Sequence, residues 1–331
     1  MSATSMTPLQ QGMLFNTLFA PQSGVDIEQL VVQTREPLSF PRFQAAWQSL
    51  IARHPMLRTR FRWEKLDTPI QEALQNPTLF LESSALPLNE FLRADRQRGF
   101  NLSEAPLLRV TVLNDSTFVW SFHHAILDGR CYPILLRELH ALYSGQELNA
   151  PPTPFSELVA WQEKRDTSSD EGFWCSLLKG FRAPTPLTVE RLGDVPAAAQ
   201  GHCAEEVTLS PETAQELSEF AAAHDFTLNT LVQGAWGALL ARYSGEDDIV
   251  FGAVRACRHG SVLGADTIIG PLINTLPVRV SAAPEINLLS YLKALRAQHL
   301  AVRPFEHSSL AAVQALSDVP RGTNLFDSLV M

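Results

Sequence analysis

Cysteine is scarce in this sequence, and its cysteines are far apart. Only Cys131, Cys175, Cys203 and Cys257 occur among 331 residues. Because no Cys-x-x-Cys pair is present, the sequence supports neither a zinc ribbon nor a dithiol redox site. We expect free thiols in a reducing compartment.

Long hydrophobic runs are also lacking. The most apolar stretch, Leu228 to Ala241, is interrupted by polar residues and is too short to span a bilayer. The first fifteen residues lack the basic region and apolar core of a signal peptide. The sequence therefore predicts a cytoplasmic protein with no membrane partner.

Positive charge is in the minority, with 26 Lys and Arg against 35 Asp and Glu and a net charge of −9. A nucleic-acid-binding surface is therefore not expected. The Gly-x-Gly-x-x-Gly and Gly-x4-Gly-Lys-Ser/Thr fingerprints are absent, so neither a dinucleotide site nor a P-loop is supported. The apolar fraction of 45% is ordinary for a globular protein.

The apolar pattern predicts helices and strands that follow one another along the chain. Phe43, Ala46, Trp47, Leu50 and Ile51 form one stripe at helical spacing, and a second stripe runs from 228 to 240. Further helices are predicted at 8–18, 87–97, 130–144, 155–165, 211–223 and 286–300. Strands are predicted at 27–34, 56–63, 105–113, 116–123, 203–209, 248–255, 273–280 and 326–331. The strands at 105–113 and 116–123 read as a hairpin, so we expect an α/β fold with mixed sheets flanked by helices.

Length and loop residues together predict two domains, since a domain averages about 150 residues. The stretch from Gly180 to Gly201 contains three prolines and has no helical period. We therefore expect a first domain at 1–180, a linker at 181–201 and a second domain at 202–331.

The segment from Phe118 to Gly129, FVWSFHHAILDG, carries the clearest chemical signal. Side chains alternate along a strand, so His123 and His124 point to opposite faces and only one can serve a given cavity. Such a pair is most often a buried structural histidine beside a bystander. No further ligand has suitable spacing, so a metal is not expected. Asp128, in the turn that follows, suits a structural role.

These residues resemble the signature His-His-x-x-x-Asp-Gly of the condensation domains of non-ribosomal peptide synthetases. Other stretches are similar to that family's motifs and occur in the family's order. They are Thr7–Phe15, Arg53–Phe61, Phe155–Trp161, Ile269–Arg279 and, more loosely, Arg303–His307. The resemblance covers essentially the whole chain.

The resemblance implies two chloramphenicol-acetyltransferase-like lobes in a V-shaped pseudo-dimer, with a tunnel between them. Donor and acceptor peptidyl carrier proteins would bring phosphopantetheine-bound substrates to the two ends of the tunnel. The acceptor amine would attack the donor thioester and form an amide. No cofactor would be bound directly, and an adenylation domain would be adjacent if the chain is part of a larger synthetase.

The resemblance also implies roles for individual residues. His124 maps to the family's catalytic histidine, and an imidazole, whose ordinary pKa is about 6.5, can accept a proton or a hydrogen bond from the amine. General base and positioning group both stay open for His124. Gly129, without a side chain, would let a backbone N–H approach the developing oxyanion.

The remaining site residues are expected to shape the site. His123 and Asp128 would be structural, with Arg58 or Arg60 as the partner of Asp128. The pair Asn274–Thr275 would shape the tunnel near His124.

The same resemblance suggests a subtype, and two alternative functions stay open beside it. The sequences of three segments are similar to those of the subtype that takes a D-configured donor and an L-configured acceptor. The segments are Pro8–Phe15, Phe122–Cys131 and Ile273–Val280. A coenzyme A-dependent acyltransferase of the same superfamily and a non-catalytic carrier-protein docking module stay open as alternatives. Because the chain stops within a family motif at Phe326–Met331, the second lobe is expected to be truncated.

Overall fold

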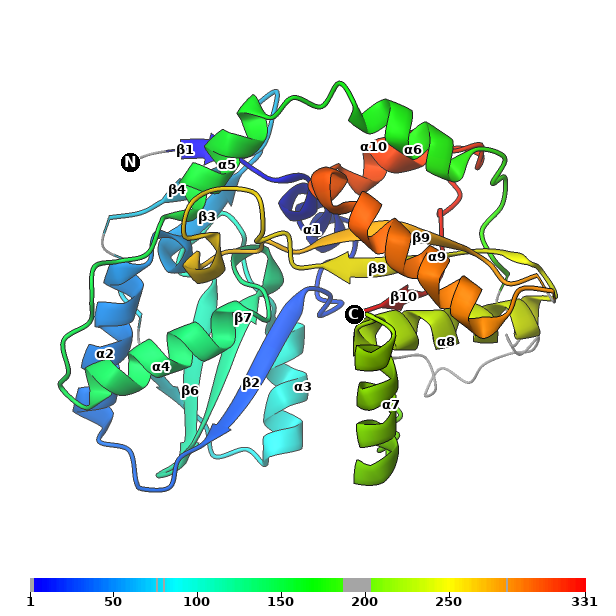
Figure 1. Ribbon diagram of the computed structural model, residues 1–331. Helices are drawn as coiled ribbons and strands as arrows, with labels where there is room; N and C mark the ends of the chain where they lie inside the picture. The colour runs from blue at the N-terminus through cyan, green and yellow to red at the C-terminus, as the bar shows by residue number, and fades with distance from the viewer. Residues whose placement is uncertain (1–2, 76, 80, 187–203, 284) are drawn as a thin grey trace, which may run out of the picture. The chain divides into compact units, whose positions relative to one another are not determined.

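The computed structural model describes residues 3–75, 77–79, 81–186, 204–283 and 285–331 (Figure 1). The chain divides into two compact units: unit 1 combines Met1–Arg165 with Ala256–Ile273, and unit 2 combines Asp166–Arg255 with Asn274–Met331. This division differs from the predicted one. The first boundary in the sequence falls between residues 165 and 166 rather than near 180, and the later segment 256–273 belongs to unit 1. Most of the predicted linker, 187–201, lies outside the described residues, so the linker stays a prediction.

The central sheet of unit 1 carries the histidine motif. Its strands, in the order β2-β7-β6-β5, are Ile27–Gln33, Thr117–His123, Leu108–Asn114 and Leu81–Ser83. Strands β6 and β7 form the predicted antiparallel hairpin, and β5 joins β6 in parallel, so the sheet is mixed. Every residue of β7 is buried. The strand that leads to His124 is therefore held rigidly on both of its faces.

Helices cover both faces of this sheet. On one face lie α2 (Phe40–Arg53) and α4 (Cys131–Tyr143), which pack against each other. The stripe predicted for α2 is confirmed, because its five residues are the buried ones. Trp47 of α2 meets Trp120 of β7 edge-on, with ring centroids 5.3 Å apart. The apolar core of unit 1 thus packs directly against the strand that leads to the histidine motif.

On the other face, α3 (Leu88–Arg98) is tied to the sheet by one buried carboxylate. Asp95 accepts hydrogen bonds from Gln29 Nε2 at 2.8 Å, Arg109 Nε at 2.9 Å and Ser121 Oγ at 2.5 Å. These donors come from three neighbouring strands. The ion pair and its hydrogen bonds compensate the desolvation of Asp95, as a buried charge requires.

A second sheet in unit 1 consists of three antiparallel strands. In the order β1-β4-β3 they are Ala3–Ser5, Ile70–Ala73 and Thr59–Arg62, and a 3-10 turn, η1 (Pro55–Arg58), precedes β3. Helices α1 (Pro8–Phe19) and α5 (Phe155–Lys164) complete the unit. Helix α1 begins with a capping box between Thr7 and Gln10. The buried Gln10 amide also donates to Ala125 O at 3.0 Å, which fixes α1 beside the histidine motif.

Unit 2 has its own mixed sheet and two apolar clusters. Its strands, in the order β10-β8-β9, are Leu329–Val330, Asp248–Arg255 and Asn274–Ser281. Its helices are α6 (Asp170–Leu178), α7 (Pro211–Ala223), α8 (Leu228–Ser244), α9 (Leu288–Ala301) and α10 (Leu310–Ala315). Helix α8 ends at Ser244, and Gly245 follows it in the left-handed conformation at φ +76°.

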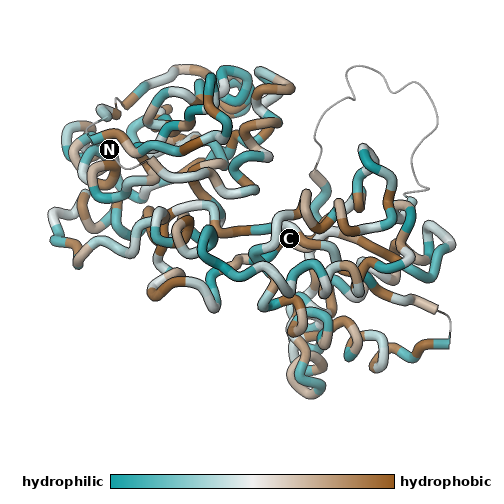
Figure 2. Tube along the Cα trace, turned by 90° about the horizontal axis from the view of Figure 1, so that it is seen from above, coloured by the Kyte–Doolittle hydropathy of each residue, from teal (hydrophilic) through white to brown (hydrophobic). Residues whose placement is uncertain are grey.

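Several predicted elements need correction. Residues 204–209 form no strand, although a strand was predicted at 203–209. The strand predicted at 56–63 begins at Thr59, and the one at 326–331 is reduced to two residues. Hydrophilic and hydrophobic residues are interspersed along the chain (Figure 2). None of the described helices is long and apolar enough to cross a membrane.

Candidate active site

His124 lies at the point where β7 ends and a 3-10 turn, η2 (His124–Ile126), begins. Its main-chain N–H donates to Asp26 O at 2.7 Å. Its ring Nδ1 lies 2.8 Å from Leu127 O. Because a carbonyl oxygen can only accept, Nδ1 carries the hydrogen and Nε2 of the neutral ring is an acceptor. The partly exposed ring is thus oriented to take a proton at Nε2.

His123, by contrast, is fully buried, and both ring nitrogens are engaged within the fold. Nδ1 accepts from Ala125 N at 3.1 Å, and Nε2 lies 2.9 Å from Thr17 Oγ1. Since the Thr17 hydroxyl donates to Met13 O at 3.0 Å, it accepts from His123 Nε2–H. Burial, and to a smaller extent the charge that His124 carries when it is protonated, lower the pKa of His123 to about 4. His123 is therefore a neutral structural residue.

Asp128 is completely buried and forms an ion pair with Arg258, which follows β8. Arg258 Nη2 lies 2.8 Å from Oδ1 and 3.0 Å from Oδ2. The carboxylate also accepts from Arg130 N at 3.0 Å and from Leu272 N at 2.9 Å. Asp128 therefore joins the turn after the histidines to the segment 256–273.

This pairing corrects the predicted partner of Asp128. Arg58 donates instead to Leu74 O, and Arg60 pairs with Glu72 on the neighbouring strand at 2.8 Å. Both arginines therefore form their hydrogen bonds in the β3–β4 region and not with Asp128. Arg258 was not predicted as the partner of Asp128, because it lies 130 residues away in the sequence and belongs to none of the motifs.

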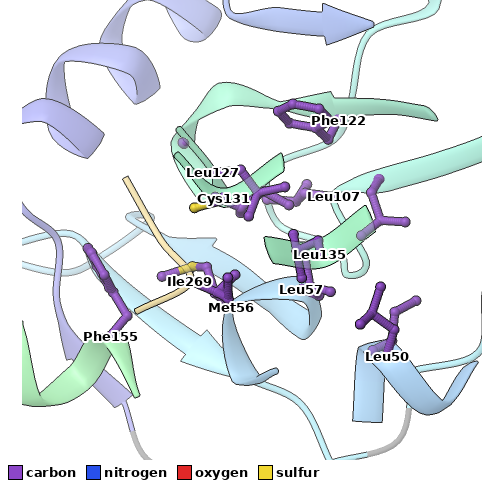
Figure 3. Close-up of a cluster of buried hydrophobic side chains, with 14 of the residues drawn as sticks. Leu50, Met56, Leu57, Leu107, Phe122, Leu127, Cys131, Leu135, Phe155 and Ile269 are labelled. Atoms are coloured by element: carbon purple, nitrogen blue, oxygen red, sulfur yellow. The ribbon is translucent and has the colours of Figure 1, made fainter. Parts of the chain in front are cut away.

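Leu127 and Cys131 flank the turn at 128–130, and both side chains are buried in the core of unit 1 (Figure 3). Cys131 Sγ lies 3.3 Å from Asp128 Oδ1 and 3.4 Å from Gly270 N. Burial and then the charge of Asp128 raise the pKa of Cys131 to about 12. The thiol therefore stays protonated, which makes it a poor nucleophile.

Gly129 is exposed, and a methyl group added at its Cα would meet no atom within 4 Å. The space beside its backbone is open, as approach of a substrate would require. Its predicted contact with an oxyanion stays a prediction.

The pair predicted to shape a tunnel has a local structural role in unit 2. The Asn274 amide donates to Glu306 O at 2.9 Å and to Ser308 O at 2.7 Å, while its oxygen accepts from Thr275 N at 3.0 Å. These bonds attach β9 to the turn after η5 (Arg303–Phe305). The placement of Asn274 and Thr275 near His124 stays a prediction.

Sequence reasoning missed three groups around the histidines: Thr17, Asp26 and the Leu127 carbonyl. Thr17 lies on a helix that was predicted, but helical spacing does not show which strand a helix contacts. Asp26 precedes β2, and the register of β2 against β7 was not predictable from the sequence. A main-chain carbonyl leaves no signal in the sequence.

Comparison with known proteins identifies the family of the chain. The condensation-domain family model matches residues 2–331. A linear gramicidin synthase protein of Brevibacillus parabrevis is 39% identical over 98% of this chain, and chondramide synthase cmdD of Chondromyces crocatus is 37% identical over 92%. The chain spans 7% and 8% of the lengths of these two relatives.

Solved structures of condensation domains share the fold. The condensation domain from Monacolin K polyketide synthase MokA superposes with a TM-score of 0.80 at 18% identity, covering 99% of this chain and 81% of that one. The starter condensation domain of rhizomide synthetase RzmA gives 0.80 at 22% identity, covering 99% and 78%. With a family model that matches nearly every residue, the chain belongs to the condensation-domain family.

Proposed function

We propose that this chain transfers a donor acyl or peptidyl group from one carrier protein to the amine of an aminoacyl group on a second carrier protein, with His124 handling the amine proton. The orientation of the His124 ring carries this proposal. Nδ1 donates to Leu127 O, so Nε2 presents its lone pair from a partly exposed ring. A base must lie within hydrogen-bond reach of the proton that it takes.

The proposed reaction balances without a metal or a redox cofactor. The acceptor nitrogen attacks the thioester carbonyl carbon, the C–N bond forms and the C–S bond breaks. A proton moves from the amine to His124 Nε2 and then to the departing phosphopantetheine thiolate. Gly129 would offer its backbone N–H to the oxyanion of the tetrahedral intermediate, where its open surroundings admit the substrate.

The proposed partners are the two carrier proteins, with an adenylation domain adjacent in a larger synthetase. Their phosphopantetheine arms would serve as substrate carriers. We place the reaction in the cytoplasm, as the sequence predicts.

A condensation assay tests the proposal. Donor and acceptor carrier proteins are loaded, mixed with the protein, and the thioester product is identified by mass spectrometry. His124→Ala should lower amide formation by about 10²- to 10⁴-fold with folding intact. The matched control is His140→Ala, which removes an exposed histidine from the same unit and should leave the rate unchanged. A loss below tenfold in a folded His124→Ala protein would remove His124 from the mechanism.

A coenzyme A thioester is the alternative donor, because the related RzmA structure is described as a complex with C8-CoA. A parallel reaction with free acyl-CoA and the same acceptor distinguishes the two donors. Faster turnover of acyl-CoA than of the carrier-bound donor would favour the alternative. Carrier-protein binding without turnover of either donor would identify a docking module.

The proposed subtype accepts a D-configured donor and an L-configured acceptor. This subtype assignment rests on the three sequence segments Pro8–Phe15, Phe122–Cys131 and Ile273–Val280. The Cys131 side chain is buried, so within this segment a steric filter near the donor α-carbon would come from the exposed Arg130 rather than from Cys131. A difference of about 1.4 kcal/mol between the two transition states gives tenfold selectivity. Matched D- and L-donor thioesters decide the question, and faster product from the L-donor would overturn the subtype alone.

A further inference from the structure

Asp26 lies beside His124 in an unusual backbone conformation. It is the third residue of a turn that Ile27 N closes on Gly24 O at 3.3 Å, and its φ is +60°. This left-handed conformation favours glycine or asparagine at the third position of a turn. Arg96 of α3 holds the turn, since its Nη1 donates to Ile27 O at 2.5 Å and to Gly24 O at 3.3 Å. These two hydrogen bonds therefore fix the backbone on either side of Asp26.

The register of β2 and β7 places Asp26 opposite His124. Ile27 pairs with His123 in the antiparallel ladder, so the next pair is Asp26 with His124. The bond from His124 N to Asp26 O, 2.7 Å long, extends the ladder by this one pair. Directly opposite residues are close enough for their side chains to interact.

The carboxyl of Asp26 is half-buried and accepts from Asn16 Nδ2 at 3.4 Å. Burial raises its pKa, while the hydrogen bond from Asn16 and the positive charge of His124 act in the opposite direction. The Asp26 carboxyl therefore lies within electrostatic reach of the His124 ring.

We propose that Asp26 is a positioning residue for His124: its carbonyl holds the main chain of the histidine, and its carboxylate counters the positive charge that the ring carries between the two proton transfers. The inference rests on the proposed function, in which His124 Nε2 takes the amine proton. A left-handed aspartate at this turn is then explained, because glycine or asparagine would satisfy the backbone but supply no charge. Backbone strain beside an active site is a recognised pointer to function.

Other charged and titratable groups act near the two residues and contribute to any pH dependence. They are Glu28 on β2, which raises the pKa of Asp26, His123 on β7, which interacts with the charge of His124, and Arg96 on α3, which donates to the turn of Asp26. A variant that changes only Asp26 leaves all of them in place.

Asp26→Asn separates the charge from the backbone. Asparagine tolerates the left-handed conformation and keeps the carbonyl that accepts from His124, but it removes the negative charge. We expect amide formation to fall about 2- to 10-fold and the acid limb of the pH–rate profile to move to lower pH. The direction follows because the ring loses its proton more readily without the nearby anion. The melting temperature should be equal or higher.

The matched control is Asp225→Asn. Asp225 is also a left-handed aspartate, with φ +58°, but it is exposed in unit 2. It should leave both the rate and the pH profile unchanged. A purely structural role for Asp26 would leave the pH profile of Asp26→Asn unchanged as well, which would overturn the inference.

A second measurement separates this inference from the proposed function. The His124 ring is titrated by NMR in the full protein and in Asp26→Asn, without substrate. A shift of the ring titration to lower pH in the variant supports the inference even if no amide is formed by the wild type. Identical titrations in the two proteins refute it, whatever the assay for amide formation shows.

Discussion

At the scale of single residues, two adjacent histidines have opposite environments. His123 has both nitrogens bonded inside the fold, while His124 has one bonded nitrogen and a partly exposed ring. Strand alternation predicted that only one of the two histidines can serve a given cavity. The main-chain carbonyl at Leu127, which selects the tautomer of His124, could not be predicted because it depends on the turn geometry.

His123→Ala should therefore act on stability rather than on chemistry. The substitution leaves a cavity and removes partners from Thr17 and Ala125 N, so we expect a loss of about 2–4 kcal/mol in the free energy of unfolding. Urea denaturation measures the loss, with the exposed His140→Ala expected within about 0.5 kcal/mol of the wild type. A stable His123→Ala protein that has lost its activity would contradict the structural role.

At the scale of elements, the Asp128–Arg258 pair joins the turn after β7 to the segment after β8. Both side chains are almost completely buried. Breaking a buried pair from one side leaves an uncompensated charge, so Arg258→Met should lower the free energy of unfolding by about 3–5 kcal/mol. Urea denaturation again provides the measurement.

Two further variants show whether the loss is due to the orphaned charge. Asp128→Leu combined with Arg258→Met removes both charges and should recover part of the stability. Arg60→Met breaks the more exposed pair with Glu72 and should lower stability by at most about 1 kcal/mol. A full loss of about 3–5 kcal/mol in the double variant would show that packing, not charge, dominates at this site.

Helices α2 and α8 show how far periodicity predicts a fold. In α2 the predicted stripe is the buried face. In α8 the buried residues are Thr230, Gln233, Gly234, Gly237 and Leu240, while Leu228, Val232 and Leu239 of the predicted stripe are substantially exposed. The helix buries its glycines because α9 approaches closely there: a methyl group on Gly234 would lie 2.6 Å from Leu292 Cδ2. Apolar spacing does not reveal which face a neighbouring helix approaches.

At the scale of the whole molecule, each unit contains a buried, neutral histidine. His123 lies in unit 1, and His299 in unit 2 bonds to Gln233 Oε1 at 2.9 Å. Burial is the main reason that each pKa is lowered to about 4, and for His299 the charges of Arg255 and Arg296 add to it. Both units should therefore respond to acid in the same pH range.

We expect the protein to lose stability as the pH falls from about 6.5 to about 4. An unfolded histidine binds its proton near pH 6.5, whereas the folded one resists until about pH 4, so protons favour the unfolded state between these values. For His123 the loss is about 3 kcal/mol at the acid end of the range. Urea denaturation at pH 7 and pH 4.5 measures it. The double substitution His123→Gln and His299→Gln should reduce the dependence on pH, and an unchanged dependence would contradict this origin.

The partnership of Asp128 with Arg258 has a consequence during synthesis of the chain. The two residues are 130 positions apart, and unit 1 is not complete until its segment 256–273 has been made. At about 5–20 residues per second, the ribosome needs roughly 7 to 26 seconds to make the residues between them. During that interval the turn that carries Asp128 lacks its partner Arg258. The ion pair that fixes the turn after His124 therefore forms late, by a contact of high sequence separation, after most of unit 2 has been translated.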